Sequence, residues 1–380
     1  MTKELDPLYE GIREEAKKVA AAAEPYAVEA DAMSTAHAGI REILAGSELW
    51  RLTVPSRWGG RFEQVDPLAV CVVREVLMAT SSHLDSMFAL QGIGSFGLAL
   101  GGSDALRDEW LPKVASGEVL AALGLTEEDA GSDLKNIVTE VRSGPDGLVL
   151  NGNKAFISNG GAAGFYSVLA KENDALSMFL VPADAPGLSV TPTPEIIAPH
   201  ILADLRFDDV VLDEGARIGE PGKAMDLVLA TLAMFRVSVA GASVGLAQAA
   251  LDEAARHAGT RIQFGRPLAK LGAVGDMLGA SWAELEAARL LTYHAAELAK
   301  TDPAESLHVS SMAKLLASET AGRITDRAVQ ISGRFGLVRD SKLERLYRQA
   351  RPMRVYEGSS EILRLGISKA LVAKTMEASR

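Results

Sequence analysis

The stretch IVTEVRSGPDGLVLNGNKAFIS, from Ile137 to Ser158, decides the fold. Its β-type runs IVTEV, GLVL and KAFIS are separated by GPDG and NG, which are turn signals. Similar short runs continue to about residue 217, with NGG and APG between them. Strands joined by tight turns predict a small antiparallel sheet. A parallel nucleotide-binding sheet would need helices between the strands, and the spacing leaves no room for them.

Both flanks of this β segment have helical spacing. Before it, Leu8, Ile12, Ala16 and Val19 form one apolar stripe at three- and four-residue steps. After about Met225, long Ala-rich amphipathic segments follow one another, which is typical of a helical bundle. The sequence therefore predicts a mainly α protein with a central β domain: an N-terminal all-helical domain at 1–120, a small antiparallel β domain at 121–224 and a C-terminal helical bundle at 225–380.

The length and composition narrow the class of protein. A chain of 380 residues exceeds one typical core, so more than one domain is expected. Hydrophobic residues make up 48% and charged residues 23%, which excludes a largely disordered chain. The net charge of -11 opposes a general affinity for nucleic acid or anionic membranes, because both need clustered Lys and Arg.

Targeting and metal signals are weak in this sequence. The first residues, MTKELDPLYEGIREEAKK, are too charged for a signal peptide, and no apolar run is long enough for a membrane span, so we expect a cytoplasmic protein. Cys71 is the single cysteine, which makes it a small buried hydrophobe rather than half of an internal disulfide. The six histidines show no HxxxH spacing, so no metal site is expected.

Six short motifs follow one another along nearly the whole chain. They are LTEEDAGSD (125–133), NGNKAFISNGG (151–161), RIQFGRPL (261–268), QISGRFG (330–336), ERLYRQAR (344–351) and YEGSSEI (356–362). In this order, and with this order of helical and β segments, the sequence resembles the acyl-CoA dehydrogenase family. Each string alone is weak evidence, but several in register are specific. The resemblance implies FAD as the cofactor and an acyl thioester as the substrate.

The dehydrogenation of a thioester needs a base for the α-proton, an acceptor for the β-hydride and donors at the developing enolate oxygen. The resemblance implies that Glu357 is the base, with Gly358 leaving room for the thioester. Some relatives carry the base at the position of Phe235 or next to it, and no acidic residue stands there. Arg236 matches an arginine near the thioester, with a substrate-side or a structural role. The plain alternative is that Glu357 is a solvated residue near a helix start.

In the β segment the resemblance implies a loop and a strand that bind the flavin. The matching residues are Leu123, Leu125, Thr126, Gly131, Ser132, Phe156, Ile157 and Ser158. Ser132 also matches a substrate-binding position. The family usually has Pro where Glu128 stands. The plain alternatives are an Asx turn at Asp129 and ordinary strand alternation at Phe156.

For the other end of FAD, the resemblance points to residues from the helical bundle. Arg261, Gln263 and Phe264 match residues that reach the cofactor of a neighbouring subunit, so this site would need at least a dimer. The remaining matches along the AMP part are Gln330, Ser332, Gly333, Arg334, Ser359 and Glu361. Arg334 replaces a second glycine, and Gly272 stands where a polar residue is usual, so the adenine end departs most from the family.

The expected function is FAD-dependent α,β-dehydrogenation of an acyl-CoA. The family implies a homotetramer and an electron-transferring flavoprotein as acceptor. One alternative keeps the flavin but uses oxygen, or acts on a carrier-protein-bound acyl group in a biosynthetic pathway; the presence of Glu357 opposes a monooxygenase, which removes no α-proton. Another is a non-enzymatic binding protein on the same fold, which the acidic charge opposes for nucleic acid. The sequence does not specify the acyl chain.

Overall fold

The computed structural model describes residues 5–145, 147–301 and 303–378, with the side chains of 303–305 left aside. Asp146 of the predicted GPDG turn lies outside the described residues. The chain divides into two compact units. Unit 1 comprises Met1–Asp31, Pro67–Ser82 and Arg236–Arg380, and unit 2 comprises Ala32–Asp66 and His83–Phe235. The finer division at 1–120, 121–224 and 225–380 stays a prediction.

Unit 2 contains one sheet in the strand order β6-β7-β3-β2-β4-β5-β8, with β1 beside β4. Most neighbours are antiparallel, but β4 pairs in parallel with both β1 and β2. Turn signals between consecutive strands do not reveal pairings between strands far apart in sequence, so these two pairings were not predicted. The strands are β1 (Ala121–Gly124), β2 (Glu140–Gly144), β3 (Gly147–Ser158), β4 (Phe165–Glu172), β5 (Ala175–Pro182), β6 (Leu188–Pro192), β7 (Leu202–Leu212) and β8 (Arg217–Ile218).

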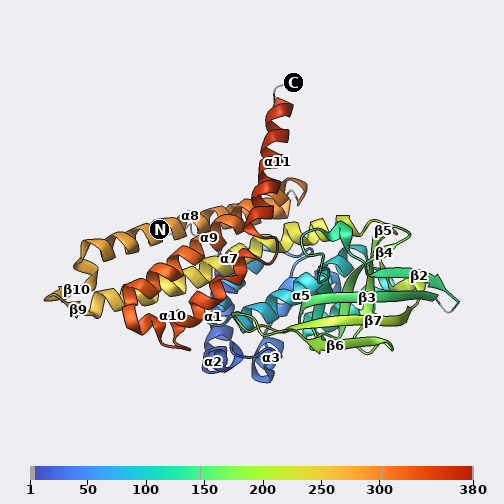
Figure 1. The fold of residues 1–380 in the computed structure, drawn as a ribbon, viewed down its shortest axis with the longest axis horizontal. Helices are drawn as coiled ribbons and strands as arrows, with labels where there is room; N and C mark the ends of the chain where they lie inside the picture. The colour runs from blue at the N-terminus through green and yellow to red at the C-terminus, as the bar shows by residue number, and fades with distance from the viewer. Residues whose placement is uncertain (1–4, 146, 302, 379–380) are drawn as a thin grey trace. The chain divides into compact units, whose positions relative to one another are not determined.

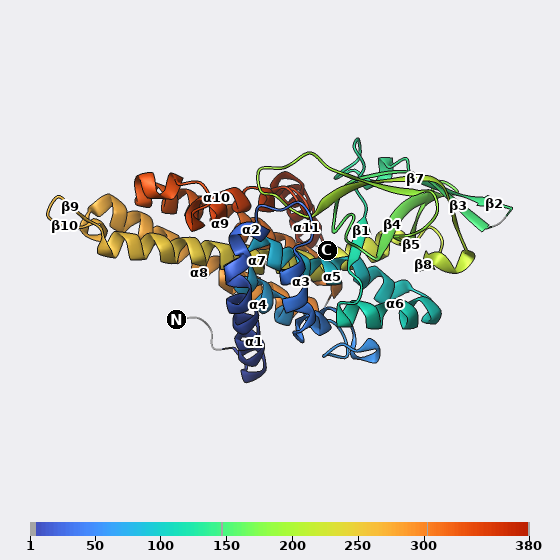
Figure 2. The same ribbon diagram turned by 90° about the horizontal axis from the view of Figure 1, so that it is seen from below.

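Strand β4 lies at the centre of unit 2, because both of its faces are buried. Phe165 and Leu169 face a core shared with helix α6, whereas Tyr166 and Val168 face a second core built by the strands. The ring of Trp110 on α6 lies 5.1 Å from that of Phe165. Figure 2 shows α6 alongside the sheet. The helices of this unit are α3 (Ala38–Ala45), α5 (Ser82–Gly101) and α6 (Asp104–Ser116).

Helix α6 begins directly after Ser103, in the stretch SDALRDEWLPKVASG. The hydroxyl of Ser103 accepts a hydrogen bond from the Leu106 amide at 3.3 Å, which caps the first turn. Gly117 follows the helix with φ of +76°, a left-handed conformation that ends it. A serine directly before the first helical turn and a glycine after the last are start and stop signals that a sequence can show.

Unit 1 is a bundle of long helices, in which α8 and α9 run side by side (Figure 1). Helix α4 packs against α1 and α8, and it meets α7 at two glycines. A Cβ atom at Gly241 would lie 2.7 Å from the Cys71 carbonyl oxygen, and one at Gly245 would lie 1.9 Å from that of Glu75. The helices are α1 (Pro7–Ala23), α2 (Ala27–Ala30), α4 (Pro67–Met78), α7 (Ala224–Thr260), α8 (Gly272–Thr301), α9 (Pro303–Ser332), α10 (Lys342–Ala350) and α11 (Ser360–Ala378).

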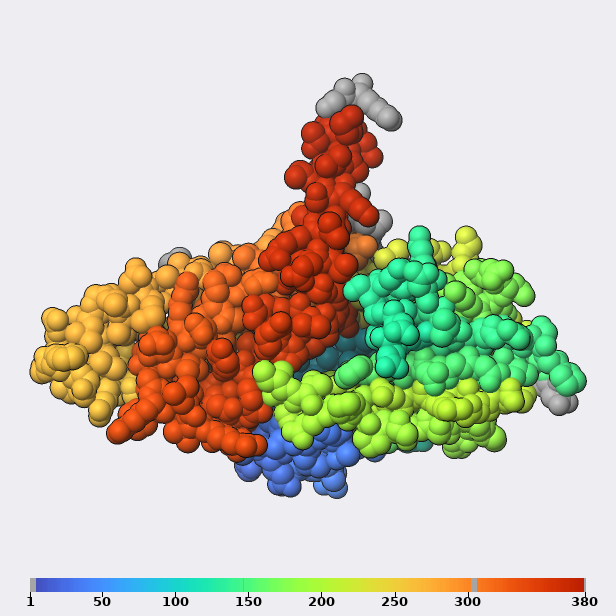
Figure 3. All heavy atoms as spheres, viewed as in Figure 1, coloured from blue at the N-terminus to red at the C-terminus, as the bar shows by residue number. Residues whose placement is uncertain are grey.

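Helices α7 and α11 differ from the other helices of the bundle. Helix α7 continues from unit 2 into unit 1 and is long and apolar enough to cross a membrane, but 72% of its most apolar window is buried inside the protein, as in a core helix. Helix α11 extends away from the rest of unit 1 (Figure 3). Its apolar side chains Leu365, Leu371, Val372 and Met376 are exposed. Such an apolar helix surface is typical of a protein contact.

Candidate active site

Glu357 occupies an unusual backbone conformation. Its φ is +55°, and Gly358 follows with φ of +94°. A left-handed conformation is strained for a residue with a long side chain, and it persists only where the surroundings hold it. The residue lies three positions before α11, so it is not part of that helix. The position is near a helix start, as the plain alternative has it, but its backbone is left-handed and its side chain is half-buried.

Two buried cations hold this turn by its carbonyl oxygens. Arg236 of α7 donates from Nε to the Glu357 carbonyl at 2.9 Å, and Lys314 of α9 donates from Nζ to the Gly358 carbonyl at 2.7 Å. Arg236 also donates from Nη1 to the Ser311 hydroxyl at 3.0 Å. Ser311 and Lys314 are three residues apart on α9 and share one face of it. The turn therefore rests on two helices.

The carboxylate of Glu357 is left available. Within the described part of the chain, no side chain or amide donates a hydrogen bond to it, and the side chain is half-buried. Burial lowers the pKa of Lys314 to about 8, while the charge of Glu357 acts in the opposite direction. Burial likewise lowers the pKa of Arg236, again opposed by Glu357. Both cations thus interact electrostatically with the Glu357 carboxylate, although neither forms a hydrogen bond to it.

The predicted flavin loop of unit 2 is fastened by a buried ion pair. Lys154 of β3 is fully buried and donates from Nζ to Glu127 Oε1 at 2.8 Å and to the Leu125 carbonyl at 3.1 Å. The Glu127 carboxylate also accepts from the amides of Val138 and Thr139. Burial lowers the pKa of Lys154 to about 8, partly offset by Glu127. The contact fixes Leu125 and the loop that carries Thr126.

Strand β3 changes register with β7 between Lys154 and Ile157, at a β-bulge. Phe156 has φ of +55° there and its ring is half exposed, whereas Ile157 is buried. Bulges reorient a side chain and are frequent beside active sites. Ser158 lies 3.2 Å from His200 through Oγ and Nε2. Phe156 is exposed and Ile157 is buried, as strand alternation predicts, but the bulge and the left-handed backbone depart from a regular strand.

The other residues predicted in this loop lie at or near its surface. Leu123 and Thr126 are partly buried, and Gly131, Ser132 and Glu128 are exposed. No atom would lie within 4 Å of a Cβ atom added at Gly131. The space over the loop is therefore open to a ligand.

At the far end of unit 1, a short hairpin holds three of the predicted cofactor residues. Its strands β9 (Ile262–Gln263) and β10 (Arg266–Pro267) are joined by Phe264 and Gly265, with φ of +51° and +73°. Two left-handed residues form the tight turn that suits a hairpin. The ring of Phe264 is 88% exposed. A ring this exposed is available for contact with another molecule.

The QISGRFG segment lies beside the base of this hairpin. The guanidinium groups of Arg261 and Arg334 stack on the Phe335 ring, at 5.8 Å and 5.1 Å from its centre. A cavity of about 260 Å³ is lined by His257, Thr260, Arg261 and Phe335. The Ser332 hydroxyl is buried and has no hydrogen-bond partner among the described residues. Arg261 and the 330–334 segment are thus brought together, close in sequence to a buried hydroxyl that has no partner in the described chain.

Two further predicted residues stand at the start of α11. The Ser359 hydroxyl accepts a hydrogen bond from the Ile362 amide at 3.4 Å, as a helix cap does. Glu361 is exposed and pairs with Arg364 at 3.6 Å. Ser360 donates to Glu319 of α9 at 2.6 Å. Helix α9 therefore holds both ends of the segment from Gly358 to Ser360.

Left-handed backbone marks the predicted site. Eight described residues other than glycine have positive φ, and five of them are Asn or Asp, which tolerate it. The other three are Phe156, Phe264 and Glu357. Each was predicted to contact the flavin, the neighbouring cofactor or the substrate. Strain at all three positions is the strongest geometric sign of function in the described chain.

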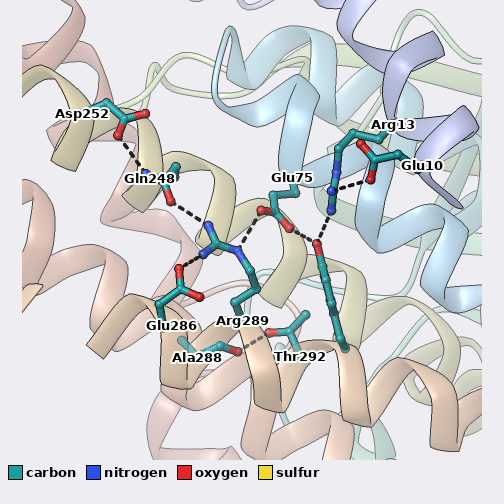
Figure 4. Close-up of polar contacts among 10 residues, drawn as sticks. Glu10, Arg13, Glu75, Gln248, Asp252, Glu286, Ala288, Arg289 and Thr292 are labelled. Atoms are coloured by element: carbon teal, nitrogen blue, oxygen red, sulfur yellow. Dashed lines mark hydrogen bonds and ion pairs between the residues drawn. The ribbon is translucent and has the colours of Figure 1, made fainter. Parts of the chain in front are cut away.

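A larger cavity lies elsewhere in unit 1. It measures about 780 Å³ and is lined by residues of α1, α4, α7 and α8, among them Arg13, Glu75 and Arg289. Figure 4 shows Arg289 hydrogen-bonded to Glu75, and Arg13 hydrogen-bonded to Glu10. Glu75 accepts from Arg289 at 3.0 Å and from the Tyr293 hydroxyl at 2.6 Å. Because the polar groups are mutually satisfied, this wall is a structural network.

Several residues of the site escaped the sequence analysis. Lys314, Lys154 and His200 each bind a predicted residue or its backbone, and each comes from a distant part of the chain. The described residues contain no group of three His, Cys, Asp or Glu side chains that would hold a metal ion.

Comparison with known proteins identifies the family of the chain. The family models of the acyl-CoA dehydrogenase N-terminal, middle and C-terminal domains match residues 7–118, 122–210 and 222–372. The chain belongs to the acyl-CoA dehydrogenase family. Both the predicted family and the predicted fold class, a mainly helical protein with a central β domain, are confirmed.

Two curated relatives have similar sequences. The probable acyl-CoA dehydrogenase FadE25 of Mycobacterium tuberculosis is 32% identical, over 98% of this chain and 96% of its own length. The human mitochondrial short-chain specific acyl-CoA dehydrogenase is 35% identical, over 87% of this chain and 81% of its own. The predicted enzyme class, an oxidoreductase acting on a CH–CH group, is thereby confirmed.

Two solved structures share the whole fold. Butyryl-CoA dehydrogenase from Megasphaera elsdenii matches with a TM-score of 0.92 and 28% identity, covering 98% of this chain and 100% of that one. A chain from a structure described as the electron-transferring flavoprotein of Acidaminococcus fermentans also reaches 0.92 and 28%, covering 98% and 99%.

Proposed function

We propose that this protein is an FAD-dependent dehydrogenase that converts an acyl-CoA to the 2-enoyl-CoA, with Glu357 as the base. One observation carries the proposal: a strained turn, held by Arg236 and Lys314 through its carbonyl oxygens, presents an unengaged carboxylate. A carboxylate already bound by donors would be a poor acceptor for a proton. Membership in the family supplies the reaction class.

In the proposed reaction, Glu357 takes the α-proton of the thioester onto a carboxylate oxygen as the carbon–carbon double bond forms. The backbone amide of Glu357 helps to bind the thioester carbonyl, where negative charge develops. The flavin, when bound, supplies the acceptor for the hydride that leaves the β-carbon. Gly358 keeps the turn open, since a Cβ atom there would lie 3.1 Å from the Leu363 side chain.

The cofactor is FAD, and the residues present suit it. In unit 2 the loop of Leu125 and Thr126 is rigidly fastened by Lys154, and Phe156 presents a half-exposed ring. In unit 1 the exposed Phe264 and the orphaned Ser332 hydroxyl lie where the adenine end is proposed. The guanidinium of Arg261 provides charge for the pyrophosphate of a neighbouring subunit's cofactor.

The same proposal includes a homotetramer and an electron acceptor. A homotetramer would place the Phe264 hairpin of one subunit on the cofactor of another and would cover the exposed apolar side chains of α11. An electron-transferring flavoprotein is the proposed acceptor, as one matched structure suggests by its name. The cytoplasm is the proposed compartment.

The test is a Glu357→Gln variant, which keeps the shape of the side chain and removes its basicity. We expect the variant to retain FAD while flavin reduction by acyl-CoA, followed without oxygen, slows by about 10²- to 10⁴-fold. Glu118→Gln, an exposed change in α6's following loop, is the matched control and should keep the wild-type rate. If acyl-CoA reduces the flavin of the Glu357→Gln variant at the wild-type rate, Glu357 is not the base.

The substrate needs its own experiment. Straight, branched and cyclic acyl-CoAs, and the same acyl groups on a carrier protein, are mixed with the wild-type enzyme and flavin bleaching is recorded. Bleaching by at least one CoA thioester is the expected result. Bleaching by carrier-bound acyl groups alone would replace CoA with a carrier protein as the substrate.

A further inference from the structure

The turn at Glu357 needs an external support. Two successive left-handed residues, one of them a glutamate, do not hold this conformation by themselves. Arg236 binds the first carbonyl of the turn, and Lys314 binds the second. Arg236 was already assigned a role near the thioester by its place in the chain. Lys314 had no assigned role.

Lys314 is an unusual choice for a purely structural donor. Its side chain is fully buried, and its hydrogen bond is made to a neutral carbonyl oxygen. A buried ammonium is costly to desolvate, which is why burial lowers its pKa to about 8. A neutral donor or an apolar side chain would fill the same space at less cost. The retained charge therefore points to a function at this position.

The charges around Lys314 come from three elements and the turn. Glu357 and Glu361 face it from the turn and from α11, Glu319 from its own helix, and Arg236 from α7. Glu319 is already occupied by Ser360, Arg354 and Arg364. Glu357 is the one of these carboxylates that has neither an ion pair nor a hydrogen bond among the described residues.

We propose that Lys314 is a positioning residue for the base: its ammonium fixes the Gly358 carbonyl and so aims the Glu357 carboxylate at the substrate. The proposal rests on the proposed function, in which Glu357 removes the α-proton. Because Lys314 meets the backbone, its charge lies near the carboxylate without occupying it. The cation therefore leaves the carboxylate free for the proton.

The experiment compares Lys314→Met, which keeps the length and removes the donor, with Lys314→Gln, which keeps a neutral donor. Lys300→Met is the control, because that exposed ammonium on α8 binds the Tyr9 hydroxyl of α1. All three are prepared as holoenzymes. Bound flavin, thermal unfolding and amide hydrogen exchange over residues 354–363 are measured before activity.

For Lys314→Met we expect normal flavin content, faster exchange over 354–363 and a rate constant of flavin reduction lower by about 10- to 10²-fold. The dissociation constant of the acyl-CoA that reduces the wild type fastest should change by less than about threefold. Lys314→Gln should lie between Lys314→Met and the wild type. Should Lys314→Met fail to fold, Lys314→Gln carries the same tests.

The double variant Lys314→Met with Glu357→Gln separates a positioning role from a general structural one. If Lys314 acts through the base, its loss should slow reduction by less than about threefold once Glu357 is gone. If the rate reduction of the double variant equals the product of the two single-variant reductions, the proposal is overturned. A Lys314→Met enzyme with wild-type exchange and wild-type reduction would also overturn it.

The same set distinguishes the two proposals. If Glu357→Gln is inactive while Lys314→Met is fully active, Glu357 is still the base, but Lys314 does not position it. Active Glu357→Gln would refute the base itself, and unchanged hydrogen exchange over 354–363 in Lys314→Met would then also refute the support of the turn.

Discussion

Glu75 and Glu357 are two carboxylates of the same unit, each near buried arginine, and their surroundings differ. Both oxygens of Glu75 accept hydrogen bonds, one from Arg289 and the other from Tyr293. The cations near Glu357 bind backbone carbonyl oxygens instead. A cation bound to a carboxylate stabilises the fold and removes a base. A cation bound to the neighbouring backbone leaves the base intact.

The surroundings of Glu75 extend this contrast. Arg289 also binds Glu286 and Gln248, and Tyr293 accepts from Arg13 (Figure 4). The network joins α1, α4, α7 and α8 within unit 1. Its side chains satisfy one another, so we expect it to determine stability and the Glu357 turn to determine rate.

The largest stability effect should follow from Arg289→Met. Loss of this guanidinium leaves Glu75, Glu286 and Gln248 without a shared donor in a buried site, which should cost about 3 kcal/mol. Chemical denaturation measures the loss, and Arg256→Met on the surface of α7 is the control, at about 0.5 kcal/mol. If Arg289→Met also slows flavin reduction per bound FAD, the Glu75 network affects rate as well as stability, which contradicts the expected division.

Tyr293→Phe should cost about 2 kcal/mol near neutral pH, because Glu75 loses a hydroxyl donor. Its pH dependence is a sharper test. Burial, and next the charge of Glu75, raise the pKa of Tyr293 above its usual value near 10. Below pH 10 both folded and unfolded chains keep the proton, so the stabilisation is complete.

Above pH 10 the unfolded chain loses this proton while the folded chain keeps it. The free energy of unfolding of the wild type should then fall by about 1.4 kcal/mol per pH unit more than that of Tyr293→Phe. Denaturation curves at a series of alkaline pH values compare the two slopes. Parallel slopes would mean that Tyr293 is not held neutral by the network.

The smallest effect should come from Ser311→Ala, on the side of the Glu357 turn. The hydroxyl accepts from Arg236, so its loss loosens one of the two supports. We expect about 1 kcal/mol or less in stability and a reduction rate lower by about fivefold or less. Stopped-flow reduction and denaturation of the same preparation measure both. A stability loss with no change in rate would show that Arg236 needs no support from α9.

The sequence predicts the order of helical and β segments because both depend on local periodicity and turn signals. The capping residue Ser103 follows from the same local rules, whereas the close contacts of Gly241 and Gly245 depend on the distant helix α4. Glu357 was singled out through the resemblance of YEGSSEI to a known family. The structure adds its left-handed backbone, which no local pattern around it specifies.

The residues that support the site could not be predicted, because each binds a partner far away in the sequence. Lys314 lies in a helix 44 residues before the carbonyl that it binds, and no periodicity links the two. Nothing in the run KAFIS marks its lysine, Lys154, as buried, yet it is buried against Glu127. The bulge at Phe156 is likewise invisible, since a register shift depends on the partner strand β7.

The one thiol of the chain gives these comparisons a convenient probe. Cys71 is fully buried at the contact of α4 with α7, where its Sγ lies 3.4 Å from the Val237 carbonyl. A thiol reagent reaches it only when these helices separate. The rate of alkylation in the native protein therefore reports how often the bundle opens, without any added label or engineered site.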